Sequence, residues 1–341
     1  MLADRSRIFN NETLLDLLAP HVSNLSLKWE TELVDASLLH LIAKFGQLKC
    51  LSLELWSMEL QDREAALAGL SGLQNLEVLD LWTADLYGPT AHAQCISHLT
   101  RLSKLRLAHY TGGLCAAAGL CALQDLYLKN SCWRENEALP ASLASMCSLT
   151  QLELRDIVLF PREDVTVLGT LPALASLSIT CVAHSASLVA SAAISRLTAL
   201  TNLCVKDVNL EGSRNINRLA ALAQLQELSL VECELTSCDF SPSLSRLQSL
   251  SLRYNRLTCL PGNLSALQAL KDIDLAWQKA DMQIDGQLAF LTCLTNLQRV
   301  HLCKFSQQAW STRSVFYLTW AERSLKARQI EGANCPVMFS Y

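Results

Sequence analysis

The sequence predicts an α/β solenoid, in which short parallel strands stack into one sheet and short helical segments connect them. Three observations predict this fold class. Three aliphatic residues, spaced as aliphatic-x-x-aliphatic-x-aliphatic, form a phrase that occurs twelve times in the 341-residue chain. Successive phrases begin 21 to 28 residues apart, a period typical of stacked repeats. Apolar residues alternate with others inside each phrase and recur every three or four positions between phrases.

Each phrase predicts one strand, because an alternation with a period of two buries one side of a strand. In one phrase, Leu126 and Leu128 would point into the core while Asp125, Tyr127 and Lys129 point outward. About twelve strands are therefore expected. In chain order, the phrases begin at Val22, Leu48, Leu76, Leu102, Leu123, Leu149, Leu174, Leu200, Leu225, Leu247, Leu270 and Leu297.

The segments between the phrases predict short helices on the opposite side of the sheet. Ile194, Leu197 and Leu200 show the spacing, which suits either a short α-helix or a 3₁₀ segment. Strands stack about 4.8 Å apart, whereas helical segments need roughly 8–10 Å. The strands should therefore line the concave side of a horseshoe and the helical segments its convex side.

The two ends of the chain leave the repeat pattern, as terminal repeats must if the core is to be covered. Residues 1–21 are expected to form an N-terminal cap, with an amphipathic segment over 8–19. Residues 22–304 are expected to form one continuous array of about twelve repeats. Residues 305–341 are expected to form a C-terminal cap and tail, with Trp310, Phe316 and Trp320 covering the last repeat.

The phrase and its period resemble the leucine-rich repeat, and the resemblance covers about 280 of the 341 residues. The best single unit runs from Leu247 through Leu250 and Leu252 to Asn255 and Leu257. In this family the asparagine at the ninth position ties adjacent turns together through backbone hydrogen bonds. Here that position holds Asn255 once and Cys233 once, and other residues, Gln278 among them, elsewhere. The asparagine ladder is therefore expected to be mostly missing.

Composition and charge narrow the class of protein further. The net charge is −4, which gives no electrostatic reason to expect nucleic-acid binding. No polybasic cluster predicts membrane attachment, no apolar run is long enough to span a bilayer, and the first residues lack a secretory signal. A cytoplasmic monomer is therefore expected. The fourteen cysteines contain no C-x-x-C pair, so they are interpreted as buried free thiols, and no metal is expected.

No catalytic or cofactor-binding motif is present in the sequence. It contains no G-x-G-x-x-G, no P-loop, no H-E-x-x-H and no G-x-S-x-G. The seven histidines are scattered over different repeats. The sequence therefore predicts a protein that is not an enzyme and uses no cofactor.

The alternation also predicts which residues face outward on the strand side, in two columns along the repeats. The second column includes Ala108 and Ala276 among larger residues. Tryptophan, tyrosine and arginine are enriched in interface hot spots. Two groups of such residues are interpreted as candidate binding sites, although the first could equally be a solvated mixed-charge face and the second could pack over the turn edge. The first group is Trp82, Arg106, Tyr127, Lys129, Glu153 and Arg155; the second is Arg253, Tyr254, Trp277, Arg299 and Lys304.

The predicted function is a non-enzymatic scaffold that binds a protein partner on the concave face. An alternative is the substrate-recognition part of a ubiquitin ligase receptor, because residues 14–29, LLDLLAPHVSNLSLKW, are similar to the stretch after the F-box in plant and algal F-box/leucine-rich repeat proteins. Only about 20 residues precede the first repeat, so the F-box itself is expected to be absent. A second alternative, regulation of a small GTPase or inhibition of an enzyme, is fold-level analogy alone.

Overall fold

The computed structural model describes residues 16–28, 41–55, 69–83, 96–108, 119–130, 141–157, 166–181, 193–210, 213–278 and 293–301. The chain divides into two compact units, unit 1 (Met1–Val158) and unit 2 (Leu159–Tyr341). The predicted C-terminal cap, Lys304 and residues 1–15 of the predicted N-terminal cap lie outside the described residues. The continuous array over residues 22–304 stays a prediction.

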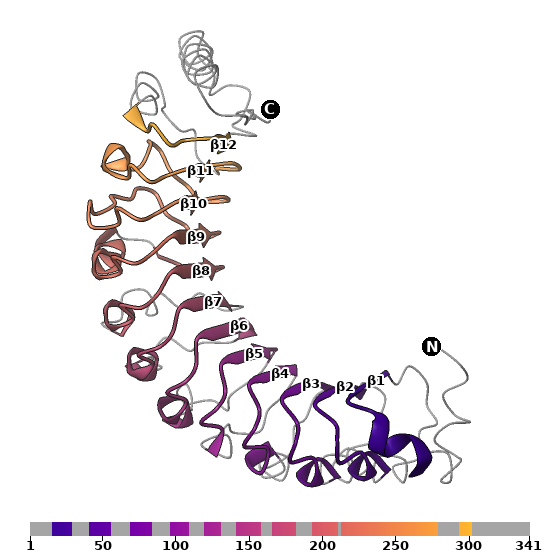
Figure 1. Cartoon of the computed structure of the whole chain (residues 1–341). Coiled ribbons are helices and arrows are strands. Elements are labelled where there is room, and N and C mark those ends of the chain that lie inside the picture. Colours follow the sequence, from indigo (N-terminus) through magenta and orange to yellow (C-terminus); the bar gives the residue numbers. More distant parts are fainter. Residues whose placement is uncertain are drawn as a thin grey trace. The chain divides into compact units, whose positions relative to one another are not determined.

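Unit 1 contains six parallel strands, and each pairs with the next strand in chain order (Figure 1). The register keeps the aliphatic positions aligned, so Leu79 pairs with Leu105 and Leu105 with Leu126. The strands are β1 (Asn24–Lys28), β2 (Cys50–Leu55), β3 (Val78–Thr83), β4 (Lys104–Ala108), β5 (Asp125–Lys129) and β6 (Gln151–Ile157). The helical segments are η1 (Ala19–His21), η2 (Leu41–Lys44), η3 (Leu70–Gly72) and η5 (Ala141–Ser145).

Unit 2 contains six further parallel strands, again paired in chain order. The last three strands have only three residues each. The strands are β7 (Ser176–Cys181), β8 (Asn202–Lys206), β9 (Glu227–Val231), β10 (Ser249–Ser251), β11 (Asp272–Asp274) and β12 (Arg299–His301). The helical segments are η6 (Thr166–Thr170), η7 (Ile194–Arg196), η8 (Ser213–Ala221) and η9 (Leu264–Ala266).

The fold prediction is confirmed: the described residues form twelve parallel strands, six in each unit, with short helices between them. The named helical segments are 3₁₀ helices, which decides between the two predicted possibilities. Their apolar residues recur every third position, and a 3₁₀ helix has three residues per turn. The backbone N–H of Leu197 accordingly donates to the carbonyl of Ile194, and that of Leu200 donates to the carbonyl of Leu197.

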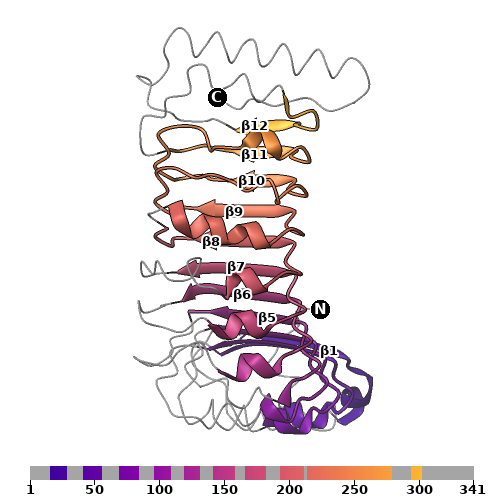
Figure 2. The same ribbon diagram turned by 90° about the vertical axis from the view of Figure 1, so that its left-hand side faces the viewer.

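The core of each unit lies between its strands and its 3₁₀ segments, which occupy opposite sides (Figure 1, Figure 2). In β5, Leu126 and Leu128 are buried, whereas Asp125, Tyr127 and Lys129 are partly exposed. From the other side, Leu143, Met146 and Leu149 are equally buried. The aliphatic residues of the repeats therefore supply the hydrophobic stabilisation, at roughly 25 cal/mol per Å² of apolar surface buried. The outward side of the strands is formed by the residues between the aliphatic ones, such as Asp125, Tyr127 and Lys129 in β5.

One further device sets the register of the strands. Between neighbouring strands of the same unit, a single carbonyl before one strand accepts two N–H groups from the next repeat: Lys49 O from Glu77 and Val78, and Gln248 O from Lys271 and Asp272. The residue two positions after the third aliphatic is often left-handed. Its φ is positive at Asn130, Asp156, Asp207, Glu232, Tyr254 and Trp277.

Among the described residues, none belongs to a helix long and apolar enough to cross a membrane.

Candidate functional site

The first predicted group does come together on the strand side of unit 1. We call these six residues, Trp82, Arg106, Tyr127, Lys129, Glu153 and Arg155, the unit 1 cluster. The ring centroids of Trp82 and Tyr127 lie 6.4 Å apart with an interplanar angle of 34°. The Arg106 guanidinium lies 5.8 Å from the Tyr127 centroid, and the Lys129 ammonium lies 5.7 Å from the Trp82 centroid. Both distances are within the range of cation–π attraction.

Ala108 makes these contacts possible, and here the sequence prediction was incomplete. Ala108 was expected to face outward as an accessible residue, but only 1% of it is exposed. The register places it on β4 between Trp82 of β3 and Lys129 of β5. Because its side chain is a single methyl group, the Lys129 side chain can reach across β4 to the Trp82 ring. A larger residue at this position would separate the two.

Charged groups surround Tyr127. The Arg155 guanidinium and the Glu153 carboxylate form an ion pair at 3.2 Å. Burial raises the pKa of the Tyr127 phenol, with smaller contributions from Arg155, which lowers it, and from Glu153 and Asp156, which raise it. The phenol therefore remains protonated at neutral pH and can donate a hydrogen bond. The indole N–H of Trp82 donates to Asp80, which orients the ring over the sheet.

Three members of the second predicted group also come together, at the end of the strands in unit 2. We call Arg253, Tyr254 and Trp277 the unit 2 cluster. The rings of Tyr254 and Trp277 are stacked, with centroids 5.5 Å apart and an interplanar angle of 21°. The Arg253 guanidinium lies 5.4 Å from the Tyr254 centroid and 3.5 Å from the Asp274 carboxylate. Arg299 is held by Asp272 on the neighbouring strand.

The two aromatic residues of the unit 2 cluster occupy the left-handed position, with φ of 56° at Tyr254 and 62° at Trp277. This conformation costs about 1–2 kcal/mol for an ordinary L-residue, and asparagine and aspartate tolerate it better. Other repeats place Asn130, Asp156 and Asp207 there. Sequence reasoning placed both aromatic residues one position past the strand, and the structure adds that their backbone is strained.

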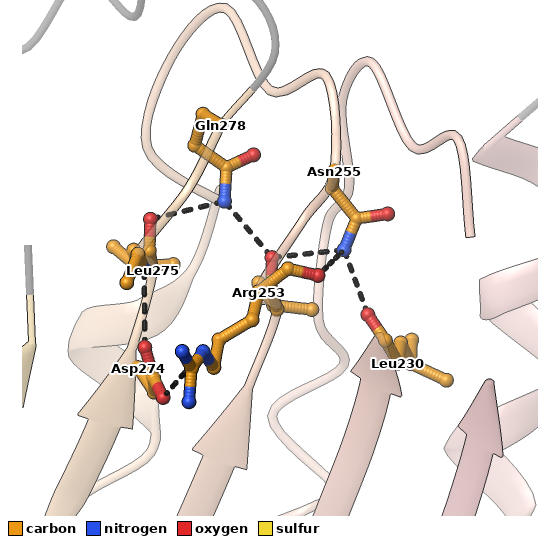
Figure 3. A network of polar contacts seen from close by, with 8 residues as sticks. Leu230, Arg253, Asn255, Asp274, Leu275 and Gln278 are labelled. Carbon is orange, nitrogen blue, oxygen red and sulfur yellow. Dashed lines mark hydrogen bonds and ion pairs between the residues drawn. The ribbon is translucent and has the colours of Figure 1, made fainter. Parts of the chain in front are cut away.

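Beneath this cluster, a ladder of buried side chains connects successive repeats (Figure 3). The Asn255 amide oxygen accepts the N–H groups of Cys233 and Leu235, and its nitrogen donates to the carbonyl of Leu230 in the preceding repeat. Gln278 repeats the pattern: its oxygen accepts the N–H of Leu257, and its nitrogen donates to the carbonyl of Leu252.

The prediction that Gln278 interrupts the ladder is therefore wrong. A glutamine amide carries the same donors and acceptor as an asparagine amide and reaches the same backbone groups from a side chain one methylene longer. Cys233 takes part as well, because its thiol lies 3.5 Å from the carbonyl of Val205. In unit 2 the ladder thus extends over three consecutive repeats, and it fixes the strand ends that carry Arg253 and Tyr254.

The interpretation of the cysteines as buried free thiols holds only in part. Eight described cysteines are free, but Cys121, Cys147 and Cys293 are exposed; Cys121 and Cys147 lie in the turns before β5 and β6. Cys233 and Cys238 are buried, and burial raises the pKa of the Cys238 thiol. Within the described ranges, no three His, Cys, Asp or Glu side chains are grouped so that they could hold a metal ion.

No protein-family model and no curated protein sequence matches the chain. Among solved structures, an internalin from Listeria monocytogenes is 16% identical, with a TM-score of 0.58. The match covers 86% of this chain and 78% of the internalin chain. TLR13, in its complex with ssRNA13, is 16% identical, with a TM-score of 0.53. The match covers 85% of this chain and 48% of the TLR13 chain. A leucine-rich repeat protein from Leptospira interrogans is 15% identical, covering 99% of this chain and 98% of its own; its TM-score of 0.47 is too low to support the fold by itself.

These likenesses concern the fold, because the identities are below the level at which function transfers. They agree with what the chain itself displays: the repeated aliphatic phrase, six parallel strands in each unit and the buried Asn255 ladder. The similarity to plant and algal F-box proteins receives no support from them. The chain has the leucine-rich repeat fold.

Proposed function

We propose that the chain is a non-enzymatic scaffold that binds a protein partner through the unit 1 cluster on its strand side. One observation carries the proposal. On the outward face of the strands, the rings of Trp82 and Tyr127 lie close to each other, and the charged groups of Arg106 and Lys129 lie over them. The buried leucines of β3 to β6 complete the core without them. Aromatic and arginine side chains dominate interface energetics because they bury much area at low entropic cost.

A purely solvated surface explains the cluster less well. Exposed ion pairs such as Arg155–Glu153 are ordinary on any surface and contribute little to stability. Trp82 and Tyr127 are different, because each is held in a defined position: Trp82 by Asp80 and Lys129, Tyr127 by Arg106. Side chains that are ordered before binding lose less conformational entropy when a partner arrives.

The proposal is tested on a partner recovered by affinity purification and mass spectrometry from the native organism, followed by calorimetric titration against the full-length chain. The double variant Trp82→Ala/Tyr127→Ala should bind at least about 100-fold more weakly, because each hot-spot truncation costs about 2 kcal/mol or more. Thr180→Ala, on β7 in the same outward column, is the matched control. If the folded double variant keeps its full affinity, the unit 1 cluster is not the contact site.

The narrower role as a ubiquitin-ligase substrate receptor rests on the similarity of residues 14–29 alone. Co-purification of a cullin adaptor with the product of the full-length transcript would support it, and its absence would contradict it.

The cytoplasmic location, the monomeric state and the lack of nucleic-acid binding stay predictions. Gel filtration coupled to light scattering, and titration with an oligonucleotide, test the last two.

A further inference from the structure

We infer that the unit 1 cluster takes an acidic segment of its protein partner, one that presents Asp or Glu side chains next to an apolar residue. The inference rests on the proposed function and names the chemistry of the partner. It is carried by three features of the cluster: its charge, the arrangement of its cations across the strands, and a buried guanidinium nitrogen.

The charge of the cluster is opposite to that of the chain. Its six members include three cations, Arg106, Lys129 and Arg155, and one carboxylate, Glu153, whereas the whole chain carries a formal charge of −4. Asp80 and Asp156 lie beside the cluster, so its cations attract an acidic partner at close range, where a carboxylate contacts Arg106 or Lys129 directly.

The register places two of these cations beside each other. Lys129 on β5 pairs with Arg155 on β6, so their backbones are about 4.8 Å apart. The Arg155 guanidinium is paired with Glu153, and the Lys129 ammonium lies over the Trp82 ring, so the two cations face the outward side from separate positions. Core packing does not require this arrangement, because both side chains face away from Leu126, Leu128, Leu152 and Leu154. A carboxylate of a partner can approach either cation from this outward side.

Arg106 supplies the most specific observation. Its Nε atom is buried, and no acceptor within the described part of the chain hydrogen-bonds to it. The guanidinium group is also held over the Tyr127 ring. A buried N–H donor without an acceptor destabilises the arrangement that holds it. A carboxylate is the acceptor that guanidinium groups bind best, through two parallel hydrogen bonds.

Tyr127 fits the same ligand. Because burial raises the pKa of its phenol, the hydroxyl stays protonated and can donate to a carboxylate oxygen. The Trp82 ring, 6.4 Å away, offers an apolar surface to a neighbouring side chain of the partner. Carboxylate and apolar contacts therefore lie within one patch.

A nucleic-acid strand fits less well than an acidic peptide. The carboxylates of Asp80, Glu153 and Asp156 lie among the cations, and each would repel a backbone that carries one negative charge per nucleotide. A peptide can place its few carboxylates against Arg106 and Lys129 and avoid the carboxylates of the chain.

The experiment uses the full-length chain and a library of random 12-residue peptides displayed on phage. Selected peptides are expected to be enriched in Asp and Glu. In fluorescence anisotropy, Arg106→Gln should weaken binding of a selected peptide roughly tenfold, and Lys129→Gln about threefold. Lys206→Gln on β8 is the matched control, because it changes the net charge equally in the corresponding outward column, and it should bind normally. Raising NaCl from about 50 to about 500 mM should weaken binding.

The outcomes separate this inference from the proposed function. If selected peptides lose binding in Trp82→Ala/Tyr127→Ala but bind equally well after their Asp and Glu are changed to Asn and Gln, the acidic partner is wrong and the contact site stands. If the folded double variant keeps its affinity, both fail. Enrichment of Lys and Arg, tighter binding of oligouridylate to the same cluster, or failure to select any peptide contradicts the inference.

Discussion

Asn255 holds two consecutive repeats together through one buried amide. Its side chain is fully buried and makes five hydrogen bonds, all of them to backbone groups. The turns after parallel strands leave backbone N–H and C=O groups inside the molecule, where no strand partner can satisfy them. The partners of the amide are Leu230, Cys233, Leu235, Leu252 and Arg253.

Replacing this amide should therefore destabilise unit 2 strongly. We expect Asn255→Ala to lower the free energy of unfolding by about 3 kcal/mol, since each orphaned buried group costs roughly 1 kcal/mol or more. Asn296→Ala is the matched control, because Asn296 makes one exposed hydrogen bond, to the carbonyl of Gln268. It should change stability by less than about 1 kcal/mol. Urea denaturation measures both, and equal losses would show that the ladder contributes no more than an exposed contact.

At the residue scale, the sequence predicts features that depend on spacing and misses features that depend on the reach of a side chain. Asn255 could be identified because it occupies the ninth position with the expected residue type. Gln278 could not, because a side chain one methylene longer satisfies the same groups only if the backbone at Gln278 lies at a suitable depth. The strain at Tyr254 and Trp277 was equally hidden, because aromatic residues rarely adopt positive φ.

At the scale of the elements, the unit 1 cluster depends on a small residue between two strands. Trp82 and Tyr127 belong to β3 and β5, which are not neighbours, yet their rings lie 6.4 Å apart. The intervening strand β4 contributes Arg106 and the buried Ala108. The size of residue 108 therefore controls whether the side chains of β3 and β5 can meet.

Enlarging residue 108 should open the cluster without unfolding the chain. We expect Ala108→Gln to separate Lys129 from Trp82 and to weaken partner binding roughly tenfold, because the preordered contacts are lost. The thermal midpoint should fall by no more than a few degrees, since the position faces away from the core. Thr180→Gln, on β7 outside both clusters, is the control. Unchanged affinity for the partner in Ala108→Gln would mean that the contact between Lys129 and Trp82 is irrelevant to binding.

The elements themselves were largely predictable, since each of the twelve phrases became a strand. The spacing between the phrases suited either an α-helix or a 3₁₀ segment, and the structure forms a 3₁₀ segment over Ala141–Ser145, for example. Strand length was not predictable. β6 has seven residues and β11 has three, although both contain the same phrase, because length depends on where pairing with the neighbouring strand ends.

At the scale of the whole molecule, stability should come from contacts between sequence neighbours. Within each unit, every repeat after the first donates two N–H groups to one carbonyl of the preceding repeat, and each strand pairs with its neighbours in chain order. In such a stack, stability is approximately a sum of repeat terms and neighbour terms. Damage to one repeat should therefore remain largely local and spread to the adjacent repeats first.

Leu250→Asp tests this expectation, because it buries an unpaired charge at a position that is only 1% exposed. We expect amide hydrogen exchange to accelerate most in β10 and in its partners β9 and β11, while β3 and β4 keep their protection. Ser251→Asp adds the same charge to the same strand on its outward side and should leave exchange nearly unchanged. A uniform loss of protection throughout the chain would instead indicate a single cooperative unit, and the sum of neighbour terms would then not describe this protein.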